Sequence, residues 1–313
     1  MKKKNAVLGI DSSNYTSSLA LVDENGILAD SRIILNVKEG NRGLRQSEAF
    51  YQHSNNFPEM FRLLEGFENI GSICVSDRPR RVEGSYMPCF KAGENYAKVL
   101  SCVLNVPIFK VSHQEGHIRA ALIDTDIDEE KPFLCVHLSG GTTEILLAQK
   151  SEFGYKTEII GKTIDISAGM FIDRIGVSMG KHFPCGANMD AEYIYGDKIK
   201  LPVCVYGTDM SFSGVETKVQ QLLKRGDYSE REIVTGVFDC VSKTLIKATK
   251  NCIKKYGVNT VVFAGGVSSG KNISSYIKEA LQSNAHVVFA NKRYATDNAV
   301  GVALLGLEFS RGE

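Results

Sequence analysis

The sequence lacks the patterns that mark membrane-spanning and secreted proteins. Among its 313 residues, no uncharged apolar run reaches the roughly 18 to 20 residues of a membrane span, so we expect no membrane partner. The basic start at Met1 leads within a few residues to Asp11, without the apolar region of a signal peptide. We therefore expect a cytoplasmic protein.

The eight cysteines include no Cys-x-x-Cys pair. This absence argues against a thiolate zinc site and against a redox dithiol. Several cysteines, such as Cys135, lie inside apolar runs, where a thiol behaves as a small hydrophobic side chain. We expect reduced, buried thiols rather than disulfides.

An excess of one charge is also missing, since 37 Lys and Arg face 36 Asp and Glu for a net charge of +1. No field of the whole chain would attract nucleic acid, so a polyanionic partner has to be held by a local patch. Arg78, Arg80 and Arg81 could form such a patch. They could equally pair with Asp77 and Glu83 in a solvated loop, and the sequence leaves both readings open.

Two segments share one pattern and indicate two related lobes. Residues 6–22 and 133–148 each read as an apolar strand, a short polar turn and a second strand. The length also fits two domains. We expect an N-terminal lobe at 1–125, a C-terminal lobe at 126–295, and a last helix at 296–313 that packs back on the N-terminal lobe.

Hydrophobic spacing predicts the elements between and after these hairpins. The expected helices are 47–65, 92–104, 168–181, 228–256, 272–281 and 298–307, and the expected strands are 107–111, 259–264 and 286–290. The acidic stretch 124–132 is the predicted connector, and 182–187 a loop. The glycine turn at 265–270 joins a strand to a helix, where backbone N–H groups are open to a phosphate.

His113 and His117 lie four residues apart on a predicted helix, so both rings can face one metal ion. Such a pair needs a third ligand from elsewhere in the chain. The alternative is two solvent-facing histidines at the start of a helix. A metallopeptidase is disfavoured, because zincins have Glu directly after the first histidine, whereas here Gln114 stands at that position.

Two hydroxyl-rich turns could hold a di- or triphosphate and its cation. One begins at Asp11 and the other is Ser139-Gly-Gly-Thr-Thr. Together with Gly265 and Gly266, these turns are typical of the cleft of an actin-like ATPase. We therefore expect an α/β protein of the actin-like (ASKHA) fold, with two related lobes and a central cleft.

These motifs resemble the TsaD/Gcp family, once called O-sialoglycoprotein endopeptidases, whose members are tRNA threonylcarbamoyltransferases. The matches follow the family order over nearly the whole chain. They are Gly9-Ile-Asp-Ser-Ser, His113-Gln-Glu-Gly-His117, Ser139-Gly-Gly-Thr-Thr, Asp165-Ile-Ser-Ala-Gly with Asp173, Pro184-Cys-Gly186, Ser211-Phe-Ser-Gly214, Gly265-Gly-Val-Ser and Thr296-Asp-Asn.

The resemblance implies a metal centre in the N-terminal lobe. The family's third ligand matches Asp297, so His113, His117 and Asp297 would hold one divalent ion, iron or zinc, with manganese also compatible. Asp11 is predicted as a catalytic residue that orders the water or phosphate shell of the ion.

The resemblance also implies a nucleotide site and partners. The ligand would be ATP or threonylcarbamoyl-AMP, and the acceptor a tRNA adenosine beside the anticodon. Further partners would be proteins of the TsaB/TsaE type, with a homo- or heterodimer formed through helices of the N-terminal lobe. The implied nucleotide and substrate residues are His137, Leu138, Ser139, Gly140, Gly141, Asp173, Gly186, Gly265, Gly266 and Gly270.

Departures from the family pattern suggest a divergent paralogue. The family Gly-Pro-Gly loop is replaced by 76–85, a Glu by Met170, a Gly by Ala187, and a nucleotide-contacting Asn by Gly270, with Asn272 as its possible substitute. The alternatives are a non-catalytic nucleotide-binding paralogue or a carbamoyltransferase with another acceptor. A metallopeptidase of the O-sialoglycoprotein endopeptidase type is less favoured.

Overall fold

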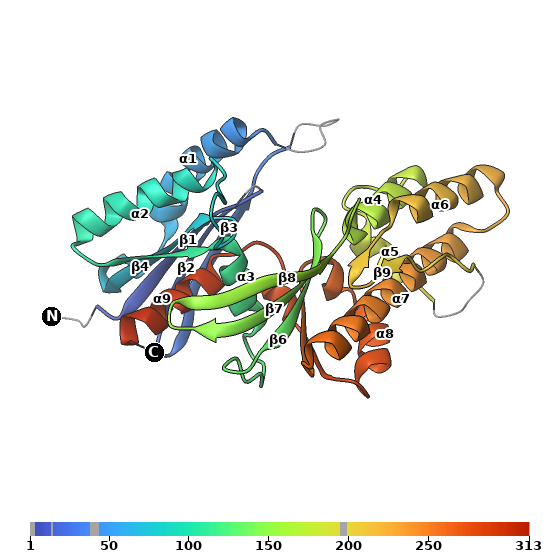
Figure 1. The fold of residues 1–313 in the computed structure, drawn as a ribbon. Helices are drawn as coiled ribbons and strands as arrows, with labels where there is room; N and C mark the ends of the chain where they lie inside the picture. Colours follow the sequence, from blue (N-terminus) through green and yellow to red (C-terminus); the bar gives the residue numbers. More distant parts are fainter. Residues whose placement is uncertain (1–3, 14, 38–43, 195–198, 313) are drawn as a thin grey trace. The chain divides into compact units, whose positions relative to one another are not determined.

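The computed structural model describes residues 4–13, 15–37, 44–194 and 199–312. The chain forms two compact units. Unit 1 comprises Met1–Ile123, Ser151–Tyr155 and Thr296–Glu313, and unit 2 comprises Asp124–Lys150 and Lys156–Ala295. Each unit contains a five-stranded sheet with helices packed against it (Figure 1). The sequence analysis assigned Ser151–Tyr155 to the C-terminal lobe, whereas these residues group with unit 1.

The sheet of unit 1 has the strand order β3-β2-β1-β4-β5. Its first three strands form an antiparallel meander, and β4 and β5 then follow parallel to β1. The strands are β1 (Ala6–Ser12), β2 (Thr16–Asp23), β3 (Gly26–Ile34), β4 (Ile70–Arg78) and β5 (Ile108–Ser112). The carboxyl ends of the parallel strands therefore meet at one edge of the sheet.

Helices pack on both faces of this sheet. The main core of unit 1 joins Leu8 and Ile10 of β1 to Phe57 and Met60 of α1 (Gln46–Leu63) and to α2 (Phe90–Leu104). Gly9 points to the opposite face and contacts α9 (Val300–Arg311), which also contacts α3 (His113–Ala121). The short helix η1 is Phe67–Asn69. Alternation along β1 thus separates the α1/α2 face from the α9 face.

The sheet of unit 2 repeats this arrangement in the order β12-β11-β6-β7-β8. β6 and β7 form an antiparallel hairpin, and β11 and β12 run parallel to β6. The strands are β6 (Phe133–Leu138), β7 (Thr143–Ser151), β8 (Gly154–Lys162), β11 (Thr260–Ala264) and β12 (His286–Phe289). The two units are therefore related in strand order, as the two similar hairpins of the sequence predicted.

One large core holds the helices of unit 2 against its sheet. It includes Val136 of β6, Phe171 of α4, Met189 of α5 and Val237 of α7. The helices are α4 (Ala168–Ser178), α5 (Gly186–Glu192), α6 (Ser213–Arg225), α7 (Glu230–Tyr256), α8 (Lys271–Leu281), and the short η2 (Val267–Ser269) and η3 (Lys292–Tyr294). A two-stranded sheet pairs β9 (Val205–Tyr206) with β10 (Asp209–Met210).

Most expected elements are present, with two differences in unit 2. Both hairpins are confirmed, as are the long helices, including α7. Helix α4 ends at Ser178 rather than at residue 181, and Gly186 begins helix α5 instead of lying in a loop. The eight cysteines are free, and six of them are buried. Among the described residues, no helix is long and apolar enough to cross a bilayer.

Candidate functional site

His113, His117 and Asp297 come together at the carboxyl edge of the unit 1 sheet. One ligand atom from each of them lies within 4.8 Å of the other two. The two imidazole Nε2 atoms are 2.9 Å apart, and Asp297 Oδ1 lies 3.2 Å from His117 Nε2 and 3.6 Å from His113 Nε2. The two histidines therefore share a carboxylate partner instead of facing solvent separately.

The start of α3 sets the position of both histidines. The Ser112 side chain accepts a hydrogen bond from Glu115 N, and the Glu115 carboxylate accepts one from Ser112 N, which is a capping box. His113 is thereby fixed as the first residue of the helix, directly after β5. Because α-helical residues four apart lie on one face, His117 stands beside it.

Close packing between α3 and α9 brings Asp297 to the histidines. A Cβ atom at Gly301 would collide with Gly116 O and would stand 2.8 Å from Ala120 N. The two helices can therefore approach at this point only because neither Gly116 nor Gly301 has a side chain. Ser13 Oγ donates to Asp297 Oδ2 at 2.9 Å and leaves Oδ1 on the side of the histidines.

Asp11 binds the Nδ1 side of the His113 ring, opposite the Nε2 atom that faces His117 and Asp297. Asp11 is fully buried, and its Oδ1 accepts hydrogen bonds from Ser76 Oγ and from His113 Nδ1, the latter at 2.9 Å. With its proton on Nδ1, the neutral imidazole presents the lone pair of Nε2 to His117 and Asp297. Carboxylate support of this kind is typical of histidines that bind metals. The two imidazoles and one carboxylate thus fit a divalent transition-metal ion.

The charges of this cluster shift its pKa values strongly. Burial alone would lower the pKa of His113, but the charge and hydrogen bond of Asp11, together with Asp297, raise it to about 10. Burial would raise the pKa of Asp297, but the two histidines hold it well below its ordinary range. The two carboxylates therefore favour positive charge at this position, which a bound cation would also supply.

The position of Asp11 differs from the predicted one. From the sequence, this carboxylate is expected to contact the water or phosphate shell of the ion. In the structure it is buried behind His113, and Oδ2 accepts from Ser13 N at 3.3 Å. Asp11 is therefore placed to position His113. The hydroxyl-rich sequence of the turn at Asp11 did not predict this role.

The predicted nucleotide residues of unit 2 gather around the turn after β6. Ser139 N donates to Thr142 O at 2.8 Å, which closes the turn that contains Gly140 and Gly141. Gly265 follows β11 at a positive φ of 97°, and a Cβ atom there would collide with Leu138 O. Glycine is needed at this position both for its conformation and for the close approach of the two segments.

Asp173 and Gly186 form a second group near this turn. Asp173 Oδ1 accepts from Cys185 N at 2.7 Å, directly before Gly186. Burial raises the pKa of Asp173, although hydrogen bonds from the Cys185 and Gly186 amides oppose the rise. His137 lies on β6, paired with Ala264 of β11, and Gly266 directly precedes η2.

The amino end of α8 is occupied by a side chain of the chain itself. The Asp190 carboxylate accepts from Asn272 N at 3.2 Å and from Ile273 N at 3.1 Å. A Cβ atom at Gly270 would lie 2.7 Å from Asp190 Oδ1. The expectation of N–H groups open to a phosphate at this helix is therefore wrong for these two amides. Gly270 makes room for Asp190, and Asn272 Nδ2 donates to Asp190 O at 2.6 Å.

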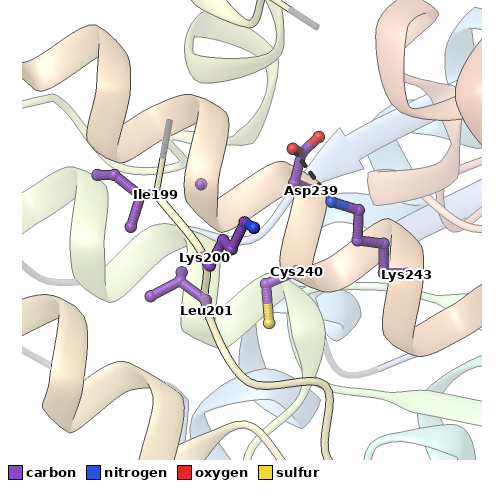
Figure 2. A pocket seen from close by; sticks show the side chains of 7 residues that line it. Ile199, Lys200, Leu201, Asp239, Cys240 and Lys243 are labelled. Carbon is purple, nitrogen blue, oxygen red and sulfur yellow. Dashed lines mark ion pairs between the residues drawn. The ribbon is translucent and has the colours of Figure 1, made fainter. Parts of the chain in front are cut away.

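A separate cavity in unit 2 contains none of the predicted site residues. Its volume is ≈ 210 Å³, and Asp239 and Lys243 of α7 face each other in it at 3.6 Å (Figure 2). Asp239 also accepts from Tyr193 Oη at 2.7 Å. The cavity is lined by Ile199, Lys200, Leu201, Gly236, Asp239, Cys240 and Lys243.

Comparison with known proteins identifies the family. The family described as "TsaD: tRNA N6-adenosine threonylcarbamoyltransferase" matches residues 38–304. The chain belongs to the TsaD family. Proteins named tRNA N6-adenosine threonylcarbamoyltransferase from Christiangramia forsetii and Kosmotoga olearia are 30% and 31% identical to it, each with 96% of this chain and 92% of the relative covered.

Solved structures show the fold of this TsaD family member. Full-length HypF shares 13% identity and a TM-score of 0.61, over 99% of this chain and 47% of HypF. Component A of the Acidaminococcus fermentans (R)-2-hydroxyglutaryl-CoA dehydratase shares 15% identity and a TM-score of 0.59, over 98% of this chain and 99% of component A. The expected actin-like ATPase fold is confirmed.

Proposed function

We propose that this chain transfers a threonylcarbamoyl group from threonylcarbamoyl-AMP to a tRNA adenosine beside the anticodon, with one divalent metal ion held by His113, His117 and Asp297. The observation that carries the proposal is the convergence of these ligands in a member of the TsaD family. The relatives named above bear the name of this activity.

The donor set suits a metal with an open coordination position, because the described part of the chain supplies three ligands there. Bound there, a divalent ion would supply Lewis-acid polarisation of the carbamate carbonyl and would neutralise phosphate charge. Two imidazoles and a carboxylate accept iron, zinc and manganese alike.

The residues of the chain itself would orient the reactants. In unit 2, we assign adenylate binding to the turn at Leu138–Gly141, to Asp173 with Gly186, and to the Gly265–Gly266 segment. The Ser139 turn is closed by its own hydrogen bonds, and Asp173 is fixed by Cys185 N, so these groups are ordered before a ligand binds. Asp11 would keep the Nδ1 proton of His113 in place through its hydrogen bond.

The test is transfer of labelled threonylcarbamoyl from its adenylate to unmodified tRNA, with TsaB- and TsaE-type partners supplied. We expect His117→Ala to lower the rate by more than roughly 100-fold, because it removes a metal ligand. His286→Ala is the matched control, since His286 is an exposed histidine that pairs with Asp126 in unit 2. Metal content is measured in the same preparations.

Two outcomes would count against the proposal. Wild-type transfer by His117→Ala would contradict the metal role. A wild-type chain that binds metal and adenylate but never acylates tRNA would instead be the non-catalytic paralogue that the sequence departures allowed.

We also propose that α1 and α2 contact a partner protein or a second copy. Leu63 of α1 and Val99 and Val103 of α2 are exposed, Val103 by 75%. Val99 and Val103 are four residues apart and share one helix face. Val103→Asp should weaken association in sedimentation experiments with a TsaB-type partner, and an unchanged association would exclude this face.

A further inference from the structure

A buried carboxylate in unit 1 holds three lysines together at the surface. Glu94 of α2 accepts from Lys91 at 2.6 Å, from Lys98 at 2.9 Å and from Lys110 of β5 at 2.7 Å. The Glu94 side chain is only 3% exposed, whereas the three lysine side chains are 44%, 53% and 41% exposed. The anion lies inside, and the cations face solvent.

The same arrangement recurs at two neighbouring carboxylates. Arg78 covers the nearly buried Asp77 with hydrogen bonds of 2.6 and 2.8 Å, and Arg81 covers the buried Glu115 at 3.0 Å. The pKa of Arg78 is raised first by its hydrogen bond to Asp77, and the charges of Glu115 and Glu94 also contribute. Lys110 Nζ lies 2.7 Å from Glu94 Oε1 and 4.0 Å from Asp77 Oδ2, so the Glu94 and Asp77 groups form one cluster. Arg81, in the loop after β4, extends it through Glu115.

We name the side chains of Arg78, Arg81, Lys91, Lys98 and Lys110 the cationic surface. Residues 76–115 contain six Lys and Arg and four Asp and Glu, in a chain whose net charge is only +1. Three of those four acids are the covered ones, and the fourth, Glu83, is exposed in the loop after Arg81. Solvent thus meets mainly positive charge here, and the buried acids hold the cations in place.

The cationic surface adjoins the candidate metal centre within the same unit. Phe90, next to Lys91, packs against the His113 ring with centroids 5.9 Å apart. Ser12 Oγ accepts a hydrogen bond from Gly93 N at 3.0 Å. Ser12 directly follows Asp11, and Gly93 directly precedes Glu94. Ser76, next to Asp77, donates to Asp11.

We propose that the cationic surface binds the phosphate backbone of the tRNA and so holds the acceptor beside the metal centre. The inference rests on the proposed function, because that function makes RNA the substrate. Its cations come from β4 and the loop after it, from α2 and from β5. Cations spread over separate segments fit several successive phosphates better than one small anion.

The test is tRNA binding by the full-length chain, measured by fluorescence anisotropy over a series of KCl concentrations. The main variant combines Lys91→Gln, Glu94→Gln, Lys98→Gln and Lys110→Gln, so that no charged Glu94 is left buried without partners. Asp77, which lies 4.0 Å from Lys110, keeps its hydrogen bonds with Arg78. We expect about tenfold or more weaker binding near 0.1 M salt, and a slope of log K against log salt reduced by roughly 2 to 3. Lys98→Glu alone, at the most exposed lysine, should weaken binding in the same direction.

The matched control combines Lys247→Gln, Lys250→Gln and Lys254→Gln, which removes three exposed lysines from α7. We expect it to bind tRNA as the wild type does. Melting temperature and metal content, measured for every variant, separate loss of the surface from loss of the fold.

The inference is overturned if the wild type shows no salt-dependent tRNA binding, or if the main variant keeps the wild-type affinity and slope. An equal loss in the α7 control would also overturn it. Transfer activity enters none of these measurements. A chain that binds tRNA through this surface without acylating it would refute the proposed function alone.

Discussion

Asp11 lies at the end of β1, where each of its carboxylate oxygens accepts hydrogen bonds from the protein. Burial would raise its pKa, but the charge of His113 and the hydrogen bonds from His113 and Ser76 lower it instead. Asp11 therefore stays ionised and fixes the proton of His113 on Nδ1. In the proposed metal centre, Asp11 would support the ligand His113.

This placement predicts the effect of Asp11→Asn. The amide keeps the size of the side chain but removes the charge behind His113, so we expect metal affinity to fall by about 10- to 100-fold. Metal retention against graded chelator concentrations measures the change. Asp23→Asn, at the end of β2, is the control and should retain metal normally. If Asp11→Asn retains metal as well as the wild type does, Asp11 does not position His113 for metal binding.

Glu94 predicts a pH-dependent contribution to stability. Burial alone would raise its pKa, but hydrogen bonds from Lys110, Lys91 and Lys98 lower it to about 2. An unfolded Glu titrates near about 4.3. The stabilisation from the ionised form is therefore fully present above the unfolded pKa and is lost as pH falls from there through the folded value.

We expect Glu94→Gln to lower the free energy of unfolding at pH 7 by about 1–3 kcal/mol. The difference from wild type should shrink as pH is lowered from about 4.5 towards 2. Urea denaturation at several pH values measures it. Glu59→Gln is the control, because Glu59 pairs with Arg62 on the exposed side of α1 and such pairs contribute little. A difference that stays constant with pH would show that the ion cluster does not carry the effect.

At the scale of elements, the contact of α3 with α9 connects the two halves of the candidate metal site. Its closeness depends on Gly301, where an added Cβ would collide with Gly116 O. Gly301→Ala should destabilise unit 1 by about 1–3 kcal/mol through overpacking and should also weaken metal binding, since Asp297 would move away from His117. Thermal melting with metal analysis tests both effects.

Gly214→Ala is the control for this prediction. Gly214 lies in α6 with no atom within 4 Å of an added Cβ, so alanine should be neutral or slightly stabilising there. If Gly301→Ala melts like Gly214→Ala and keeps its metal, the two helices have room that the static packing does not show.

Most elements that the sequence predicted have a strong local pattern, but the largely buried strand β4 was missed despite its apolar residues. β1 and β6 are almost wholly buried and read as continuous apolar runs before a polar turn. β3 was missed because it is a partly exposed edge strand without clean alternation. α6 was missed because only Val215 and Val219 of its residues are buried, which leaves a weak helical pattern.

The candidate site was harder to predict than these elements, because its residues are distant from one another in the sequence. The spacing of His113 and His117 predicts a shared face, but no local pattern points to Asp297, and only the resemblance to a family supplied it. The burial of Asp11 and the capping of α8 by Asp190 arise from tertiary packing. Such roles depend on which groups are excluded from water, and single-sequence patterns do not record that.

At the scale of the whole molecule, each unit has its own core and its own set of proposed ligands. The metal residues and Asp11 belong to unit 1, and the proposed adenylate residues belong to unit 2. A ligand that binds only the folded form of a segment stabilises that segment against local unfolding. Metal and adenylate should therefore protect different parts of the chain from hydrogen exchange.

We expect removal of the metal by a chelator to increase exchange in α3 and in the first turn of α9, with α7 unchanged. A non-hydrolysable adenylate should slow exchange in the turn after β6 and at the start of α5, with α3 unchanged. Mass spectrometry of peptides from these segments measures both effects, and His117→Ala, which already lacks a metal ligand, should show no further response to chelator. Protection that always spreads over both units would mean that the two ligand sets act on one cooperative structure, because coupling of that kind requires the units to open together.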